Sequence, residues 1–195
     1  MTELRAALAS RNEHKLAELR AALPGWQVEL LSADDYPPED AGSYVENARA
    51  KARHGRRTAA DVWVLGEDSG LEVAGLEGAP GLRSARWYGD ADPVDALLDR
   101  LAGIEGGGRG ARYVCELVAL AADGTEVGGT GVLPGRIAER PAGNEGFGYD
   151  PVFVPEGETR TVAELGNEWK RAHSHRARAA QALAGALAHD LDTTS

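Results

Sequence analysis

A short apolar run followed directly by an acidic segment is the feature that most constrains how this chain can fold. Residues Val62–Leu65 are apolar, partly β-branched and bounded by polar residues, which predicts a buried strand. The segment Gly66–Leu71 then adds two adjacent carboxylates, a hydroxyl and a second glycine. Paired carboxylates at a strand end, in a loop that glycine allows to bend, can hold a hard cation through oxygen. An acidic turn that binds nothing is the structural alternative.

The totals of the chain limit the classes of protein to which it can belong. Its 195 residues suggest one domain spanning residues 1–195, or two lobes that share a core. A net charge of −10 argues against a broad surface for nucleic acids or anionic membranes. Cys115 is the single cysteine and lies in an apolar run, so we expect a small core residue rather than a nucleophile. Without an 18-residue apolar run or a signal peptide, we expect a cytoplasmic protein.

The N-terminal part of the chain has the pattern of a strand, a polar loop and a helix. Leu4–Ala9 is mildly apolar, and apolar residues recur at helical spacing in Leu16–Leu23. The first and fourth residues of the intervening Ser10–Lys15 have the form of a capping box. A helix that begins there directs backbone N–H groups at an anion, to which Asn12 adds a donor and Lys15 a charge. A capped helix with a solvated lysine is the alternative.

A second helix is predicted from Ser43 to about Ala60, after a strand at Val28–Leu31 and an acidic loop. Its first turn again has a capping box, so Glu46 has a purely structural explanation as the capping carboxylate. The functional alternative is that Glu46 faces Asp68 and supplies a second carboxylate to the same cation. The rest of the helix is basic and mostly a solvated face, with Lys51 the expected exception.

The middle of the chain is predicted to contain a third helix and a β-hairpin. The helix begins at Asp92–Pro93, with proline at its first position, and ends at Gly103. Two extended runs follow, Arg112–Leu120 and Thr125–Leu133, joined through Asp123–Gly124 and ended by Pro134–Gly135. A last short strand is expected at Val152–Pro155.

Two further segments carry residues that suit a binding site. The glycine-rich loop Pro141–Pro151 presents Phe147, which can stack on a nucleobase or instead fill the core. A helical region from Val162 to Leu191 breaks near His173–Ser174, and Lys170, His175 and Arg176 gather at the break. Cations in the first turn of a helix oppose its dipole, so a nearby anion or acceptor would remove the conflict.

Taken together, these motifs resemble the inosine triphosphate pyrophosphatase family, enzymes that remove non-canonical purine nucleoside triphosphates. The resemblance covers nearly the whole chain. It is carried by these segments: Ser10–Lys15, Tyr44–Ala48, Glu67–Leu71, Gly78–Gly81, Ser84–Arg86, Gly146–Pro151 and Ser174–Arg176. Several motifs in order are far more specific than any single one.

The resemblance implies an elongated α/β fold, with a central mixed sheet flanked by helices and two lobes separated by an active-site cleft. It also implies a homodimer that hydrolyses ITP, dITP and XTP to the monophosphate and pyrophosphate with Mg²⁺. Nucleic acid and membrane are not expected partners. Cleavage of an α–β phosphoanhydride needs neutralised phosphate charge and a positioned water, which suits this set of carboxylates and cations.

Site roles are carried over by motif. The metal would be bound by Glu46 and Asp68, and Asp68 would accept the proton of the attacking water, with Lys15 and Glu46 completing the catalytic set. The substrate would be bound by Ser10, Arg11, Asn12, Glu13, His14, Lys15, Lys51, Ser69, Phe147, Gly148, Tyr149, Asp150, Lys170, His175 and Arg176. We hypothesise that His175 and Arg176 donate to the 6-oxo group, which adenine lacks.

One departure from the family pattern concerns the phosphate loop, where the family usually has Thr-Gly-Asn and this chain has Ser10–Arg11–Asn12. Serine keeps the hydroxyl. Arg11 excludes any backbone conformation that only glycine tolerates. Its guanidinium would point toward phosphate or toward solvent.

Three other functions are alternatives. A related pyrophosphatase could act on dTTP, UTP or modified pyrimidine nucleotides, although the Phe147 loop and Ser174–Arg176 favour a purine. A non-catalytic nucleotide sensor need not keep both Glu46 and Asp68, and both are present. A plain phosphatase would release orthophosphate, so the product separates it.

Overall fold

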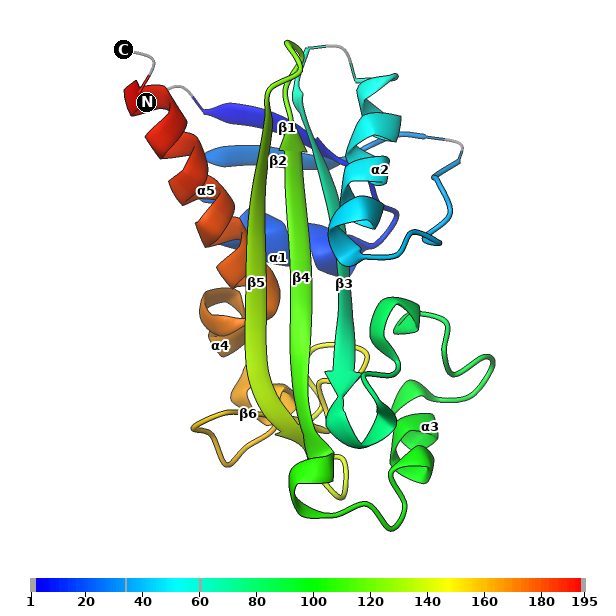
Figure 1. Ribbon diagram of the computed structural model, residues 1–195. Helices are drawn as coiled ribbons and strands as arrows, with labels where there is room; N and C mark the ends of the chain where they lie inside the picture. Colours follow the sequence, from blue (N-terminus) through cyan, green and yellow to red (C-terminus); the bar gives the residue numbers. More distant parts are fainter. Residues whose placement is uncertain (1–2, 34, 60, 194–195) are drawn as a thin grey trace. The chain divides into compact units, whose positions relative to one another are not determined.

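The computed structural model describes residues 3–33, 35–59 and 61–193, which form an α/β fold built on one mixed sheet (Figure 1). The strand order is β2-β1-β3-β4-β5-β6, with β1 parallel to β2 and β3, and β5 antiparallel to β6. The strands are β1 Leu4–Leu8, β2 Trp26–Leu30, β3 Trp63–Val73, β4 Gly110–Leu120, β5 Glu126–Ile137 and β6 Phe153–Pro155. The α-helices are α1 Glu13–Ala22, α2 Tyr44–Arg56, α3 Pro93–Arg100, α4 Val162–His173 and α5 His175–Thr193. The predicted α/β class, a mixed sheet with helices, is confirmed.

The chain divides into two compact units, each with its own core. The first comprises residues 1–68, 115–131 and 176–195, and the second comprises residues 69–114 and 132–175. In the first unit, fully buried Leu8, Leu65 and Leu183 belong to one apolar cluster. In the second, fully buried Leu97 and Phe153 belong to another. Strands β3, β4 and β5 contribute residues to both units.

The predicted acidic loop after β3 is wrong, because the whole segment Gly66–Leu71 lies inside the strand. Glu67 and Asp68 are therefore consecutive strand residues, and strand geometry directs their side chains to opposite faces. A strand tolerates two buried carboxylates only if both are paired, and the pairs are described below. Figure 1 shows α2 on one face of the first unit's strands and α1 with α5 on the other.

The first predicted capping box is also wrong, because α1 is capped by Asn12 rather than by Ser10. The Oδ1 atom of Asn12 accepts from the backbone N–H groups of His14 at 2.9 Å and Lys15 at 3.2 Å. The Ser10 hydroxyl accepts instead from the N–H of Asn12 at 3.1 Å. The polar loop is thus held by its own side chains up to the first residue of the helix.

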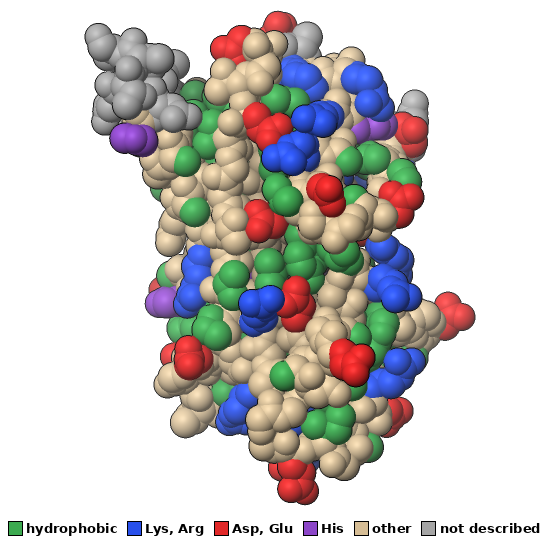
Figure 2. Space-filling view, viewed as in Figure 1, with side chains coloured by type: hydrophobic (Ala, Val, Ile, Leu, Met, Phe, Trp, Pro, Cys, Tyr) green, Lys and Arg blue, Asp and Glu red, His purple; other side chains and the backbone are tan. Residues whose placement is uncertain are grey.

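Helix α2 begins as predicted, with the Ser43 hydroxyl accepting from the N–H of Glu46 at 3.3 Å. It ends at Arg56, and the predicted end at Ala60 lies outside the described residues. Basic side chains are visible over this region in Figure 2. One of them, Arg49, pairs with Glu126 of β5 at 2.7 Å, which fits the expected solvated face.

The hairpin prediction needs one correction, since β5 runs through Pro134–Gly135 to Ile137. The carbonyl of Pro134 accepts from the N–H of Glu156 at 2.9 Å. Proline has no N–H group, and at this position of the strand it contributes its carbonyl as an acceptor. A Cβ atom on Gly135 would lie 2.4 Å from the Val154 carbonyl oxygen, so only glycine allows β6 this close. The helical break at Ser174 is confirmed.

The other described α-helices and strands agree with their predicted types, with ends that differ by a few residues. The short 3₁₀ helices at Ala74–Leu76, Gly81–Arg83 and Gly106–Arg109 were not predicted. Within the described ranges, no helix is both long and apolar enough to cross a membrane.

Gly66 allows α2 to lie against β3 with almost no space between their backbones. A Cβ atom at Gly66 would lie 1.9 Å from the carbonyl oxygen of Ala48 and 2.7 Å from the amide nitrogen of Ala52. Both alanines are fully buried. Small residues on both sides therefore fix the distance between α2 and the strand that carries Asp68.

Gly66→Ala is expected to lower the free energy of unfolding by about 3 kcal/mol, because the methyl group meets backbone that cannot move aside. Gly128→Ala on β5 is the matched control, since its Cβ would meet only the Leu117 carbonyl oxygen at 3.8 Å. That change should leave stability within about 1 kcal/mol of wild type. Urea unfolding of both variants measures the difference, and equal stabilities would contradict this account of the packing.

Candidate functional site

Glu67 is the centre of a buried ionic cluster in the first unit. Its side chain is fully buried, and its Oε2 atom lies 2.6 Å from the Lys15 ammonium. Its Oε1 atom accepts from Nε and Nη2 of Arg176 at 3.1 and 3.0 Å. The Cys115 thiol donates to the same Oε1 atom at 3.5 Å. Burial alone would raise the pKa of Glu67, but Lys15, Arg176 and Lys51 hold that pKa well below its usual range, so the carboxylate stays ionised.

Arg176 is also buried and is shared between two carboxylates. Its third nitrogen, Nη1, pairs with Glu18 of α1 at 2.5 Å. Burial opposes the charge, yet Glu67 and Glu18 outweigh burial and raise the pKa of Arg176. The guanidinium therefore has ion pairs on three of its nitrogen atoms. The hypothesis that Arg176 donates to a purine 6-oxo group stays a prediction.

Asp68 lies on the other face of β3 and contacts α2. Its Oδ2 atom accepts from the Asn47 amide at 2.9 Å, and its Oδ1 atom accepts from the Lys51 ammonium at 3.1 Å. The side chain is only 5% exposed. Burial is the largest influence and raises the pKa of Asp68, although Lys51 and Asn47 oppose it. A carboxylate with a raised pKa is a better proton acceptor than an ordinary surface aspartate.

Lys51 connects this carboxylate to a second one that sequence reasoning missed. Its ammonium contacts Glu39 and also donates to the backbone carbonyl of Glu67 at 2.9 Å. Two carboxylates, Glu39 and Asp68, therefore meet at one cation. Glu39 lies in the acidic loop before α2, and its position so near a helix start was the available signal. Asn47 was also missed, although it precedes Lys51 by one helical turn on the same face.

Glu46 has a different environment from the one expected of a metal ligand beside Asp68. It is exposed, and its Oε2 atom accepts from the Ser43 hydroxyl at 2.8 Å. Among the described residues, no group of three or more His, Cys, Asp and Glu side chains is placed to hold a metal ion. A cation here would therefore need ligands from its substrate or from water as well as from the protein.

The predicted phosphate loop, Ser10–Lys15, has ordinary backbone geometry at Arg11. Glu77 is the only non-glycine residue with positive φ in the described ranges, so Arg11 does not occupy a conformation reserved for glycine. The Arg11 guanidinium lies over the Tyr36 ring at 5.3 Å from its centre. The exposed residues of this loop are Arg11, Glu13 and His14, while Ser10, Asn12 and Lys15 are partly buried.

The predicted base-binding residues of the second unit gather around Asp150. Its Oδ2 atom accepts from the Lys170 ammonium at 2.6 Å and from the N–H of Phe147 at 2.8 Å. The Lys170 ammonium also lies 4.0 Å from the centre of the Phe147 ring. Phe147 is partly exposed, so it does not simply fill the core. Gly148 has φ of 62°, a conformation that favours glycine at this turn.

Tyr113 of β4 was missed by sequence reasoning, because it reads as one more apolar strand residue. Its ring stacks on the His175 imidazole with 4.6 Å between centres and 10° between planes. Its hydroxyl donates to the Oδ1 atom of Asp150 at 3.4 Å. Tyr149 is buried, and its hydroxyl donates to the Ser84 carbonyl at 3.0 Å. Ser69 is partly buried at the start of this unit.

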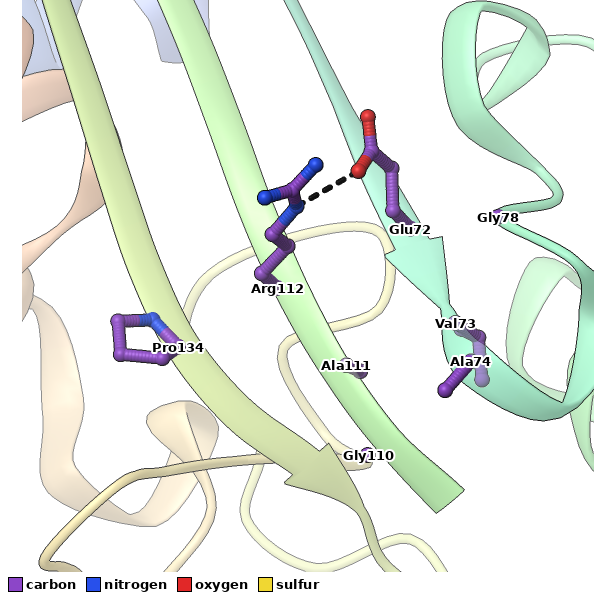
Figure 3. Close-up of a pocket in the computed structure, with 8 residues that line it drawn as sticks. All are labelled: Glu72, Val73, Ala74, Gly78, Gly110, Ala111, Arg112 and Pro134. Carbon is purple, nitrogen blue, oxygen red and sulfur yellow. Dashed lines mark hydrogen bonds and ion pairs between the residues drawn. The ribbon is translucent and has the colours of Figure 1, made fainter. Parts of the chain in front are cut away.

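A separate hollow of about 320 Å³ lies in the second unit and involves none of the predicted site residues (Figure 3). Across it, Arg112 of β4 pairs with Glu72 of β3 at 2.7 Å. The remaining lining residues are Val73, Ala74, Gly78, Gly110, Ala111 and Pro134.

Glu67→Gln should lower the free energy of unfolding by about 3–5 kcal/mol at pH 7, because it leaves buried cations without their counter-ion. The contribution of a carboxylate with a depressed pKa is present above its unfolded pKa and is lost as the pH falls through the folded pKa. The difference from wild type should therefore shrink below about pH 4. Glu116→Gln, which changes a β4 carboxylate that accepts from the Thr130 hydroxyl, is the control for denaturant unfolding at both pH values. An equal loss in both variants would contradict the assignment.

Solved structures agree with this chain over nearly its full length. A HAM1 protein from Coxiella burnetii has a TM-score of 0.79 at 32% identity, covering 95% of this chain and 99% of that one. A nucleoside-triphosphatase / dITP/XTP pyrophosphatase from Mycobacterium abscessus has a TM-score of 0.71 at 39% identity, covering 98% and 100%.

Sequence relatives give the same picture. A dITP/XTP pyrophosphatase of Bdellovibrio bacteriovorus is 42% identical over 186 residues, which cover 90% of this chain and 94% of that relative. A dITP/XTP pyrophosphatase of Nocardia farcinica is 43% identical over 206 aligned positions, covering all of both chains. Residues 6–186 match the Ham1 family. The resemblance inferred from the motifs is thus confirmed, and the chain belongs to the Ham1 family.

Proposed function

We propose that this protein hydrolyses the non-canonical purine nucleotides dITP, ITP and XTP to the nucleoside monophosphate and pyrophosphate. The observation that carries the proposal is the likeness, over nine-tenths of the chain or more, to relatives named dITP/XTP pyrophosphatase. We further propose a homodimer in the cytoplasm, which sedimentation of the purified protein and fractionation of cells would test.

The triphosphate is proposed to bind at the start of α1. The polar loop Ser10–Lys15 leads into the helix, and the Lys15 ammonium is a fixed cation beside it. Helix N-termini favour anions, and hydrolysis of a phosphoanhydride needs its negative charge neutralised. Lys51, which is bonded to Asp68, supplies a second cation in the same unit.

Asp68 is proposed as the proton acceptor. The water oxygen forms a bond to the α-phosphorus, the bond to the leaving pyrophosphate breaks, and the water proton passes to Asp68. The raised pKa of this carboxylate supports the role, because proton transfer is most efficient when the pKa of the base approaches the working pH. Lys51 and Asn47 hold the carboxylate in place.

Mg²⁺ is proposed as the cofactor, and the donor set suits it. Carboxylate oxygen is the ligand that Mg²⁺ prefers, and such sites are commonly completed by substrate phosphates and water. When bound, Mg²⁺ would neutralise phosphate charge. We propose Asp68 and Glu39 as its protein ligands, because both carboxylates meet at Lys51. Glu46, expected from the motif, stays a prediction that the same experiment tests.

The base is proposed to bind in the second unit. Phe147 would stack on the purine, and Asp150, Lys170 and His175 would surround its polar edge. The partial exposure of Phe147 and the bonds that hold Asp150 support this arrangement. Gly148 and Tyr149 would shape the loop.

Product analysis with Mg²⁺ present is expected to give pyrophosphate from dITP, ITP and XTP, and little from ATP, GTP, dTTP or UTP. Asp68→Asn should lower kcat by at least about 100-fold, the usual contribution of a positioned base. Asp123→Asn, in the exposed β4–β5 turn, is the control and should match wild type. Orthophosphate as the first product, or turnover mainly of dTTP or UTP, would overturn the proposal.

The second metal ligand is identified by titrating Mg²⁺ against activity in Glu39→Gln and Glu46→Gln. Losing a carboxylate ligand should raise the Mg²⁺ concentration for half-maximal rate by about tenfold or more. We expect this increase for Glu39→Gln and a change of less than about twofold for Glu46→Gln. The reverse result would restore Glu46 as the ligand and exclude Glu39.

A further inference from the structure

Glu67 has no part in the reaction proposed above, although its buried carboxylate pairs with both Lys15 and Arg176. We propose that Glu67 is a positioning residue, which holds the Lys15 ammonium in place for the triphosphate. This inference rests on the proposed function, because that function assigns Lys15 to the phosphates.

The contacts of Glu67 belong to a series of ion pairs with alternating charges. Lys15 pairs with Glu67 at 2.6 Å, Glu67 pairs with Arg176 at 3.0 Å, and Arg176 pairs with Glu18 at 2.5 Å. Lys15 and Glu18 are three residues apart on α1, so they lie on the same side of that helix. The series therefore starts and ends on the first turns of α1, and joins them to β3 and α5.

The two oxygens of the Glu67 carboxylate have separate partners. Oε1 accepts both bonds from Arg176, while Oε2 lies against Lys15. Arg176 is 2% exposed, and two of its donors hold Oε1 in place, which leaves Oε2 directed at Lys15. The position of the Lys15 ammonium follows from that direction.

Fixing a lysine matters because its side chain is long and flexible. A free ammonium on four methylenes loses rotamer freedom when it binds a ligand, which weakens binding. Here Glu67 already orders the side chain of Lys15, which is 17% exposed. An ammonium group has three donors, so a bond to Glu67 is compatible with further bonds to phosphate oxygens.

The same contacts separate Glu67 from the proposed metal ligands. Glu67 faces α1 and α5 and is matched by two cations, whereas Asp68 faces α2 and meets Glu39 at Lys51. Successive strand residues point to opposite faces, so Glu67 can position Lys15 while Asp68 binds the metal and accepts the proton. Glu67→Gln should accordingly leave the Mg²⁺ requirement within about twofold of wild type.

A double-mutant cycle tests whether Glu67 acts through Lys15. Glu67→Gln alone is expected to raise KM for dITP by about tenfold, and to lower kcat by less than about threefold. In a Lys15→Met background the same change should raise KM by less than about twofold, because the group that Glu67 positions is already gone. Additive effects on KM would mean a general structural role and would overturn the proposal.

A second readout does not depend on turnover. In the nucleotide-free protein, mass spectrometry would follow acetylation of Lys15, with Lys170, which pairs with Asp150 in the second unit, as the internal control. Glu67→Gln should speed acetylation of Lys15 by about fivefold or more, because its ammonium loses its partner, and leave Lys170 within about twofold. An unchanged rate at Lys15 would overturn the proposal even if the enzyme is active. A wild type without turnover would overturn the proposed function alone.

Conservative and matched variants complete the design. Glu67→Asp keeps the charge but shortens the reach by one methylene, and should give a KM between those of wild type and Glu67→Gln. It replaces Glu67→Gln in both assays if that variant does not fold. Glu116→Gln makes the same chemical change on β4 and should leave KM and the acetylation of Lys15 unchanged. A wild-type KM in Glu67→Asp and Glu67→Gln alike would also contradict the proposal.

Discussion

The first unit depends on two neighbouring carboxylates that are buried in the middle of a strand. Ionised groups are costly to remove from water unless they are paired, so β3 requires cations from the helices that cover it. Lys15 and Arg176 form ion pairs with Glu67 on one face of β3, and Lys51 forms an ion pair with Asp68 on the other. The ion pairs that result connect α1, α2 and α5 to the same two strand residues. They also fix the positions of the charged side chains in this unit.

The apolar packing serves the same geometry. Small residues, Gly66 with Ala48 and Ala52, bring α2 close enough for Lys51 and Asn47 to reach Asp68. On β5, a Cβ atom at Gly129 would lie 2.2 Å from the Ala179 carbonyl oxygen of α5. The close approach of α2 and α5 to the sheet thus depends on glycine and alanine at the contacts. The ion pairs that these helices make with β3 depend in turn on that approach.

The second unit uses a comparable principle around Asp150, with one buried carboxylate, one lysine and a backbone N–H. Aromatic rings complete it, because Tyr113 stacks on His175 and the Lys170 ammonium lies over Phe147. Each unit therefore carries charged residues that the sequence predicted for the site, around Asp68 in the first unit and around Asp150 in the second. Membership of the Ham1 family is shown for the chain as a whole, whereas the contacts establish only which side chains are fixed and by what.

Sequence by itself determined the type of nearly every described element, the break at Ser174 and the motifs that identify the family, because these depend on local periodicity, capping and residue order. It misjudged Gly66–Leu71 as a loop, since a carboxylate pair is tolerated in a strand only when distant cations neutralise it. It also placed the first cap at Ser10 instead of Asn12, which is a local error because Asn12 accepts from residues only two and three positions away. Tertiary structure alone decided the contacts of Glu39, Asn47, Tyr113 and Glu67, because the partners lie far apart in the chain: Arg176 and Glu67, 109 residues apart, meet only after the strands and helices have packed.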